Sequence, residues 1–304
     1  MKKKILISGG AGFIGSNLAN KLSESKQFEI HVCDNLLTGN KKYLNKSILF
    51  HNIDVNSFKK VSYIFNKYKF DYVFHYAAVV GVNRTLDNPI KVLEDIKGLE
   101  NIFKLSVSNK IKRIFFSSSS EVYGEPVHMP QNEEITPLNS KLPYAVVKNL
   151  GENFCKAYFF KYKLNYNILR FFNTYGHNQS EDFVISSFIK LAKSNKPIKI
   201  FGDGNQSRTF CHINDNVDTT INLIKNHKYS NQIINIGHNK IYTINELAKK
   251  IIKIFNSNSK IIHIKARKDG DMTRRQPDNS KMIKILNRKL ITLDQGLKMF
   301  RKNN

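Results

Sequence analysis

The 304-residue chain carries 49 lysines and arginines against 24 aspartates and glutamates, a formal net charge of +25, and 41% of its residues are hydrophobic. This composition is typical of a folded globular protein, and no segment approaches the roughly 18 consecutive apolar residues of a membrane-spanning helix. The cationic residues are spread along the whole chain without a basic block or a zinc-finger pattern, which favours a solvated surface over a nucleic-acid site. We therefore expect no nucleic-acid partner, no membrane partner and a cytoplasmic location.

The three cysteines, Cys33, Cys155 and Cys211, are far apart in the sequence and odd in number. Such spacing gives neither a disulfide framework nor a paired-cysteine metal pattern. Cys33 lies in an apolar stretch and Cys155 in a helical pattern, so both are expected to be buried as small hydrophobic residues. We expect no metal site.

Short apolar strands alternate with helical segments through the first half of the sequence. Parallel strands that are joined by helices form a sheet covered on both faces. The expected strands are 5–7, 29–34, 48–53, 72–76, 114–117 and 166–171, and the expected helices begin at Ser16 and cover 90–109 and 145–161.

The pattern changes after about residue 175. A helix is expected over 182–194, then a short strand over 197–201 that ends in a Gly-Asp-Gly turn. Thr243, followed three residues later by Glu246, indicates a helix start with a capping box. The sequence thus predicts an α/β protein: a Rossmann-type, doubly wound parallel sheet over 1–175 and a smaller C-terminal α/β lobe over 176–304.

Three glycines, Gly9, Gly12 and Gly15, lie between the first strand and the first helix. Glycines at this spacing permit a tight turn, let backbone amides approach a pyrophosphate and allow the helix to pack closely on the strand. Asp34 ends the second strand, where a carboxylate accepts hydrogen bonds from ribose hydroxyls and repels a 2′-phosphate. A glycine turn with a capping aspartate is the simpler interpretation, but the joint spacing favours an NAD site.

Tyr144 and Lys148 are four residues apart at the start of an expected helix, so both lie on one face. An ammonium group near a phenol favours the phenolate, which can take a proton from a sugar hydroxyl as hydride leaves the same carbon. Serines 117–120 follow a strand rich in phenylalanine, and hydroxyls at the end of a parallel strand face the ligand crevice. The alternative interpretations are that Tyr144 and Lys148 are an ordinary pair on the helix surface and that the serines form a loop with no catalytic role.

With these residues in place, the chain resembles the extended short-chain dehydrogenase/reductases of the NAD-dependent epimerase/dehydratase family. The matching segments run from end to end of the sequence. They are the glycine turn, Asp34-Asn35, Asp54-Val55, His-Tyr-Ala-Ala at 75–78, Ser-Glu-Val-Tyr-Gly at 120–124, Tyr144-x-x-x-Lys148, Arg-Phe-Phe-Asn at 170–173, Gly-Asp-Gly-Asn-Gln-Ser-Arg at 202–208 and Arg-Arg-Gln-Pro-Asp at 274–278.

The resemblance implies a role for each matching position. Tyr144 would be the base, with Lys148 also holding the nicotinamide ribose and Ser119 as the hydroxyl partner. The implied cofactor residues are Gly9, Gly12, Phe13, Ile14, Gly15, Asp34, Asn35, Asp54, Val55, Tyr76, Ala77, Ala78, Ser117, Tyr144 and Lys148. The implied substrate residues are Ser119, Ser120, Glu121 and Tyr144, with Asn173, Arg208 and Arg275 on the nucleotide diphosphate of a sugar, UDP being favoured.

Glu121 bears on which reaction follows oxidation at C4 of the sugar. A carboxylate there could remove the C5 proton, which suits a dehydratase or a decarboxylase, whereas a 4-epimerase needs no such group. Dehydratases of thymidine-linked glucose usually carry an aspartate before this glutamate, and this chain has Ser120. The closest resemblance is to UDP-glucuronate decarboxylases, although residues 78–85 depart from the loop expected there. A lyase that acts through a 4-keto sugar is predicted, with a 4-epimerase as the alternative.

Two further expectations follow from the resemblance. Apolar positions in 92–107 and 147–160 could form a four-helix interface, so a homodimer is predicted, and polysaccharide biosynthesis is the expected context. A catalytically silent NAD-binding homologue is the competing class, although Tyr144 and Lys148 are both present.

Overall fold

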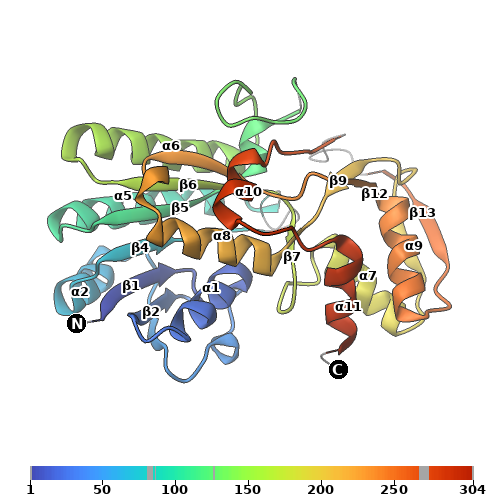
Figure 1. The fold of residues 1–304 in the computed structure, drawn as a ribbon, viewed down its shortest axis with the longest axis horizontal. Helices are drawn as coiled ribbons and strands as arrows, with labels where there is room; N and C mark the ends of the chain where they lie inside the picture. The colour runs from blue at the N-terminus through green and yellow to red at the C-terminus, as the bar shows by residue number, and fades with distance from the viewer. Residues whose placement is uncertain (1, 81–84, 86, 126, 267–273, 303–304) are drawn as a thin grey trace.

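A parallel sheet forms the larger part of the structure, a computed structural model that describes residues 2–80, 85, 87–125, 127–266 and 274–302. Within these residues seven strands pair in the order β11-β6-β5-β4-β1-β2-β3, and every pairing in this sheet is parallel (Figure 1). The predicted doubly wound Rossmann-type sheet is confirmed. Its strands are β1 (Lys3–Ser8), β2 (Phe28–Asp34), β3 (Leu49–Asn52), β4 (Tyr72–His75), β5 (Arg113–Ser119), β6 (Tyr166–Phe171) and β11 (Gln232–Ile236).

Both faces of the sheet are buried, which explains the continuous apolar strands. In β1, Ile5 and Ile7 face one hydrophobic cluster and Leu6 faces the other, and none of the three is exposed. Helices α1 (Phe13–Ser23), α8 (Ile213–Lys225) and α10 (Ser280–Leu286) contribute to the first cluster. Helices α2 (Phe58–Tyr68), α5 (Asp95–Ser108) and α6 (Pro143–Tyr162) contribute to the second, with the short α4 (Pro89–Leu93) beside α6.

The smaller lobe has its own hydrophobic cluster and lies at one end of the sheet (Figure 1). The predicted helix start is confirmed, since Thr243 and Glu246 form a capping box. The lobe's elements are α7 (Val184–Lys193), β8 (Ile198–Phe201), β9 (Ser207–Thr209), β12 (Ile241–Thr243), α9 (Ile244–Phe255), β13 (Ile261–Ile264) and α11 (Leu293–Lys302). The second half of the chain also supplies β11 and α8 to the large sheet, and the division at residue 175 stays a prediction.

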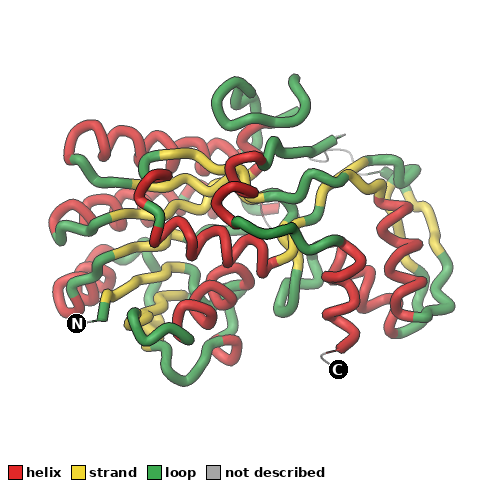
Figure 2. Tube along the Cα trace, viewed as in Figure 1, coloured by secondary structure: helices red, strands yellow, loops and turns green. Residues whose placement is uncertain are grey.

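The order of the strands determines where a ligand can bind. From β1 the chain proceeds outward through β2 and β3, then returns to β4 on the other side of β1 and continues through β5 and β6. A crevice opens outside the carboxyl ends of the strands at such a reversal. The short helix η2 (Ser120–Tyr123) follows β5 at this edge, and the loop between η2 and α6 projects away from the sheet (Figure 2). The pair β7 (Thr174–Tyr175) and β10 (Cys211–His212) lies between sheet and lobe.

Other expectations concern cysteines, metals and membranes. The three cysteines are free and buried, as predicted for Cys33 and Cys155. In the part of the chain that the structure describes, no group of three or more His, Cys, Asp or Glu side chains could hold a metal ion. Among the same residues no helix combines the length and the apolar character needed to cross a membrane.

Candidate active site

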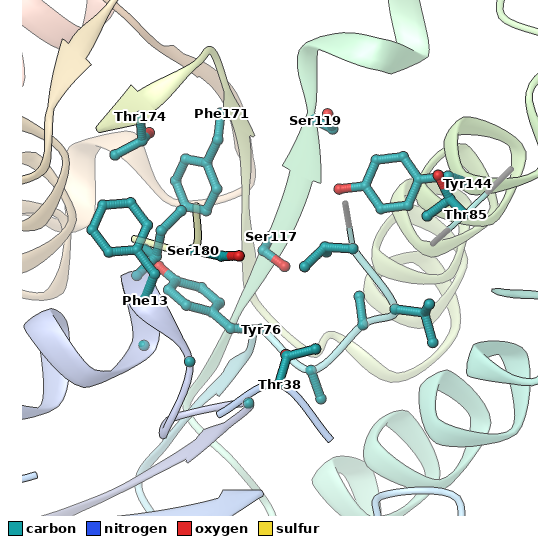
Figure 3. A pocket seen from close by; sticks show the side chains of 18 of the residues that line it. Phe13, Thr38, Tyr76, Thr85, Ser117, Ser119, Tyr144, Phe171, Thr174 and Ser180 are labelled. Carbon is teal, nitrogen blue, oxygen red and sulfur yellow. The ribbon is translucent and has the colours of Figure 1, made fainter. Parts of the chain in front are cut away.

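A cavity of about 750 Å³ opens at the carboxyl ends of the central strands (Figure 3). It is lined by every predicted site residue except one, Arg208. The predicted residues that line it are Gly9, Gly12, Phe13, Ile14, Gly15, Asp34, Asn35, Asp54, Val55, Tyr76, Ala77, Ala78, Ser117, Ser119, Ser120, Glu121, Tyr144, Lys148, Asn173 and Arg275. Of the loop at 78–85, residues 81–84 lie outside the described part of the chain.

The glycine turn is shaped so closely that side chains could not replace Gly9 or Gly15 without a shift of the backbone. Gly9 has φ +66°, and a Cβ atom there would lie 2.5 Å from the backbone nitrogen of Ala77. A Cβ atom on Gly15 would lie 2.4 Å from the carbonyl oxygen of Gly9. Helix α1 begins directly after Gly12, so its positive end faces the cavity. These features fit the diphosphate of a dinucleotide.

Asp34 closes this side of the cavity at the end of β2. Its carboxylate accepts hydrogen bonds from the backbone amides of Ala11 (3.0 Å) and Leu36 (2.8 Å). Burial raises the pKa of Asp34 above its ordinary value, and these amides act in the opposite direction because they stabilise the charged form. Beside it, the Asn35 side chain donates to Asp54 at 3.0 Å. Such a carboxylate can bind ribose hydroxyls and disfavours a 2′-phosphate.

Tyr144 and Lys148 project from the first turns of α6 into the cavity. The Lys148 Nζ atom donates to the carbonyl oxygen of Ser117 (2.7 Å) and to its hydroxyl (3.2 Å), and it lies 5.7 Å from the centroid of the Tyr144 ring. Figure 3 shows the Tyr144 hydroxyl directed into the pocket, on the side where Ser117 and Ser119 lie. The predicted pair is therefore brought to one site with its serine partners.

Burial is the largest influence on both groups. It raises the pKa of the Tyr144 phenol, and the Glu121 carboxylate adds to this effect, whereas hydrogen bonding to Ser119 lowers that pKa. Burial lowers the pKa of Lys148 to about 8. The lysine was expected to lower the phenol pKa, but the net shift is upward, because removal from water disfavours the phenolate.

Glu121 lies in η2 and is paired with an arginine from far along the chain. Arg275 Nη2 lies 2.6 Å from Glu121 Oε1, and both side chains are largely buried. The backbone amide of Glu121 donates to the Ser119 hydroxyl at 3.2 Å. The cavity therefore holds a carboxylate and a guanidinium group close to Tyr144, an arrangement that can bind and protonate or deprotonate a sugar near its reacting carbon.

The remaining predicted substrate residues lie on either side of this pair. Asn173 has φ +29° and donates from its side chain to the carbonyl oxygen of Thr209 at 3.1 Å. Arg208 lies on β9, where it is buried and donates to the carbonyl oxygen of Ser207 at 2.8 Å. A β-bridge joins Ser207 to Arg274, and Phe210, two residues after Arg208, lines the cavity. The role of Arg208 on the diphosphate stays a prediction.

Sequence reasoning missed the buried polar network that holds this edge of β5. Glu152 accepts two hydrogen bonds from Arg170, at 2.8 and 2.7 Å, and one from the Ser118 hydroxyl at 2.6 Å. Arg170 also donates to the Tyr123 hydroxyl at 2.8 Å. These contacts fix the strand end and η2, and so position Ser119 and Glu121. The acidic and basic residues were visible in the sequence, but nothing in their spacing indicated that they pair.

Asp95 is a further residue that sequence reasoning missed. It is the first residue of α5, and it lines the cavity. Its Oδ2 atom accepts a hydrogen bond of 2.8 Å from the backbone amide of Val79. Burial raises the pKa of Asp95, and the Val79 amide and the charge of Lys148 oppose that rise. An acid at a helix start is common in any sequence, so its place in this cavity could not be inferred.

Comparison with known proteins shows the family to which the chain is similar. The model of the family described as "NAD dependent epimerase/dehydratase family" matches residues 5–237. The chain is 36% identical to a putative UDP-glucose 4-epimerase of Methanocaldococcus jannaschii, covering 97% of this chain and 96% of the relative. It is 33% identical to a UDP-N-acetyl-alpha-D-glucosaminuronate decarboxylase of Bacillus cytotoxicus, covering 98% and 96%.

Among solved structures, the chain is similar to a UDP-glucose 4-epimerase of Thermotoga maritima in complex with UDP-glucose. The TM-score is 0.93 at 30% identity, and the match covers 99% of each chain. The similarity therefore includes the smaller lobe as well as the sheet.

Proposed function

The chain belongs to the NAD-dependent epimerase/dehydratase family, and we propose that it is a nucleotide-sugar lyase of the UDP-glucuronate decarboxylase type. It is an enzyme that uses NAD and works through a 4-keto sugar, and the proposal concerns the step after oxidation. The observation that carries it is the Glu121–Arg275 pair, 2.6 Å apart, in the cavity that holds Tyr144.

Oxidation at C4 of the sugar is assigned to the Tyr144 side of the cavity. Tyr144, as phenolate, takes the proton of the C4 hydroxyl, and Ser119 holds the same oxygen. NAD, when bound, accepts the hydride from C4 and later returns it. Lys148, anchored on Ser117, places a positive charge beside these groups.

The next step is assigned to the Glu121–Arg275 side. A sugar with a ketone at C4 and a carboxylate on C5 is a β-keto acid, which loses carbon dioxide and leaves the bonding electron pair on C5. Arg275 can bind the departing carboxylate through its guanidinium fork. Glu121 lies in the same site and, once it has taken up a proton, can deliver that proton to C5. In a 4,6-dehydratase the same carboxylate would instead remove the C5 proton.

A nucleotide-sugar 4-epimerase is the second candidate, and the ion pair is compatible with it as well. In that enzyme the Glu121 carboxylate, held by Arg275, would order η2 without a chemical role, and the 4-keto sugar would rotate in the cavity before the hydride returns. The similarity to UDP-glucose 4-epimerases supports this alternative.

The test is incubation of the purified protein with UDP-glucuronate, UDP-N-acetylglucosaminuronate, UDP-glucose and dTDP-glucose, followed by mass spectrometry. Loss of the mass of carbon dioxide from a uronate is the expected result. Loss of the mass of water identifies a dehydratase. A product of unchanged mass that separates from its substrate by chromatography identifies an epimerase. Either of these last two results, without decarboxylation, overturns the proposal.

We also infer that the protein is a homodimer that pairs through α5 and α6. Side chains four residues apart on α6 form an apolar row that is exposed or partly exposed: Val146, Leu150, Phe154, Tyr158 and Tyr162. Such a surface suits burial against a second copy. Light scattering at micromolar concentration should give twice the chain mass, and a monomeric mass would contradict the inference.

Two contextual assignments complete the proposal. A cytoplasmic location suits three buried free thiols and a substrate of the nucleotide-sugar class. A modified nucleotide sugar is the donor that a glycosyltransferase consumes, so we assign the enzyme to polysaccharide biosynthesis.

A further inference from the structure

Asn235 is a fully buried amide near the end of β11, and its side chain contacts both of the segments that supply the Glu121–Arg275 pair. On one side, its Oδ1 atom accepts a hydrogen bond of 2.7 Å from the Tyr123 hydroxyl. Tyr123 is the last residue of η2, the short helix that carries Glu121. The carbonyl oxygen of the amide therefore holds the helix to which the carboxylate belongs.

The nitrogen of the same amide holds the segment that carries Arg275. Asn235 Nδ2 donates to the carbonyl oxygens of Gln131 (2.9 Å) and Asp278 (3.2 Å). These two residues are also joined directly, because the Asp278 amide donates to the Gln131 carbonyl oxygen at 2.7 Å. The Gln131 amide donates in turn to the carbonyl oxygen of Gln276 at 2.8 Å. The residues that directly follow Arg275 are thus tied to Asn235.

The surroundings of Asn235 allow its amide only one orientation. Arg170 Nη1 donates to the Tyr123 hydroxyl at 2.8 Å, so this hydroxyl must direct its own hydrogen to Asn235. The two carbonyl oxygens on the other side can only accept hydrogen bonds, so they require the amide nitrogen. The backbone is fixed as well, since the Asn235 amide donates to Glu133 Oε1 at 2.9 Å and β11 pairs with β6 at this position.

The placement of Glu121 matters because its two carboxylate oxygens are in different situations. Oε1 lies 2.6 Å from Arg275 Nη2. Oε2 is buried and has no hydrogen-bond partner among the residues that the structure describes. A buried carboxylate oxygen without a partner is costly unless a ligand satisfies it. The ion pair therefore determines where the oxygen that remains for the sugar lies.

We propose that Asn235 is a positioning residue that sets the approach of Glu121 to Arg275, and so acts on the step after C4 oxidation without touching the sugar. Asn235 is not one of the residues that line the cavity. The inference rests on the proposed function for the nature of that step, whereas the geometry of the ion pair can be measured without substrate. Loss of the amide should release η2 and the Arg275 segment from each other, while Tyr144 and Lys148 stay in place on α6.

The experiment compares the wild-type protein with Asn235→Ala. In a crystal structure of the variant we expect the Glu121–Arg275 nitrogen–oxygen distance to exceed about 4 Å, the limit of an ion pair. In a single turnover with UDP-glucuronate, bound NADH should form at a nearly unchanged rate. Product should form about 10- to 100-fold more slowly, because displaced groups lose their alignment with the sugar. Absorbance of the nicotinamide band and quenched samples read by mass spectrometry measure the two rates.

The control separates positioning from general stability. Asn167 is also a fully buried asparagine, and it lies near the start of β6, at the opposite edge of the sheet. Its side chain accepts a hydrogen bond from Arg113 and donates to the Tyr229 carbonyl oxygen. Asn167→Ala should lower the unfolding temperature as Asn235→Ala does, with both reaction rates unchanged. If Asn235→Ala does not fold, Tyr123→Phe carries the same expectation, because it removes the hydroxyl that joins η2 to Asn235.

The outcomes separate this inference from the proposed function. An ion pair that stays closed in Asn235→Ala overturns the inference, and so does an equal loss of NADH formation and product formation. An open pair with a normal rate of product formation also overturns it. Failure of the wild-type protein to decarboxylate UDP-glucuronate overturns the proposed function alone. The two rates are then measured with the nucleotide sugar that reduces bound NAD, and an open pair with slowed product formation still supports the role of Asn235.

Discussion

Gly9 lines the cofactor side of the cavity and Arg275 lines its sugar side, and these two sides are assembled in different ways. The centre of the cofactor side comes from one stretch of sequence, residues 9–34, with the glycine turn, the start of α1 and the end of β2; the loop after β4 and the end of β5 complete it. The sugar side joins η2, Asn173 and Arg275, which are far apart in the chain. The first side depends on backbone geometry that a local sequence pattern can specify, whereas the second depends on long-range packing. Mutations should therefore separate binding of the cofactor from conversion of the sugar.

The largest expected effect is at Tyr144, where the two sides meet. Tyr144→Phe removes the base while it keeps the ring, so we expect the rate of C4 oxidation to fall by about 10²–10⁴. Affinity for NAD should be nearly unchanged, because the glycine turn and Asp34 are intact. Single-turnover absorbance of NADH measures the first quantity and a fluorescence titration the second. Tyr63→Phe, on α2 and 61% exposed, is the control. If Tyr144→Phe oxidised the sugar at the normal rate, Tyr144 would not be the base.

Glu121→Gln should impair conversion of the sugar and leave cofactor binding unchanged. If the carboxylate serves C5 and C6, the variant still oxidises C4 but forms product about 10²-fold more slowly, and it accumulates bound NADH with a 4-keto sugar. Absorbance of the nicotinamide band after one turnover shows this state. Glu134→Gln, which removes an exposed carboxylate from the loop before α6, is the matched control. Normal turnover of Glu121→Gln would mean that the carboxylate orders its loop, and the 4-epimerase alternative would then be preferred.

Asp34 tests the cofactor side in the same way. A buried carboxylate beside a 2′-phosphate is a like-charge pair, so we expect NAD to bind about 100-fold more tightly than NADP. Asp34→Asn keeps an acceptor for the ribose hydroxyls. It should reduce the difference between the affinities for NAD and NADP, mainly because NADP binds more tightly to the variant. Calorimetric titration with each dinucleotide measures both affinities. Equal affinities in the wild-type protein would contradict the assignment of Asp34.

The same division explains how much of the fold and of the site could be predicted. The glycine turn, Asp34 and the Tyr144–Lys148 spacing are local, so the sheet and the cofactor side followed from the sequence. Helix α8 was not predicted, because its Asn and Thr residues have low helix propensity and its order depends on buried Ile213 and Val217.

The interior pairs were out of reach for a similar reason. Glu121–Arg275 and Glu152–Arg170 join residues whose proximity is decided only when η2, α6 and β6 pack together. A local pattern specifies neither partner, so the pairing of Arg275 with Glu121 was not predicted, and the role of Arg275 on the diphosphate stays a prediction.

Arg208 provides the smallest and finest test, because resemblance alone assigns it to the diphosphate. It does not line the cavity, yet Phe210 does, and an extended chain sends side chains two residues apart to the same side. Arg208→Lys keeps the charge but loses the planar fork that matches phosphate oxygens. We expect KM for the nucleotide sugar to rise about tenfold, with kcat nearly unchanged, because the diphosphate is bound equally before and during the reaction. Steady-state kinetics measure both quantities. Arg301→Lys is the matched control, because the Arg301 guanidinium group donates to the carbonyl oxygen of Ile254 on the protein surface. A drop in kcat at constant KM would instead place Arg208 with the residues that position Glu121 and Arg275, since β9 is bridged to that segment through Ser207 and Arg274.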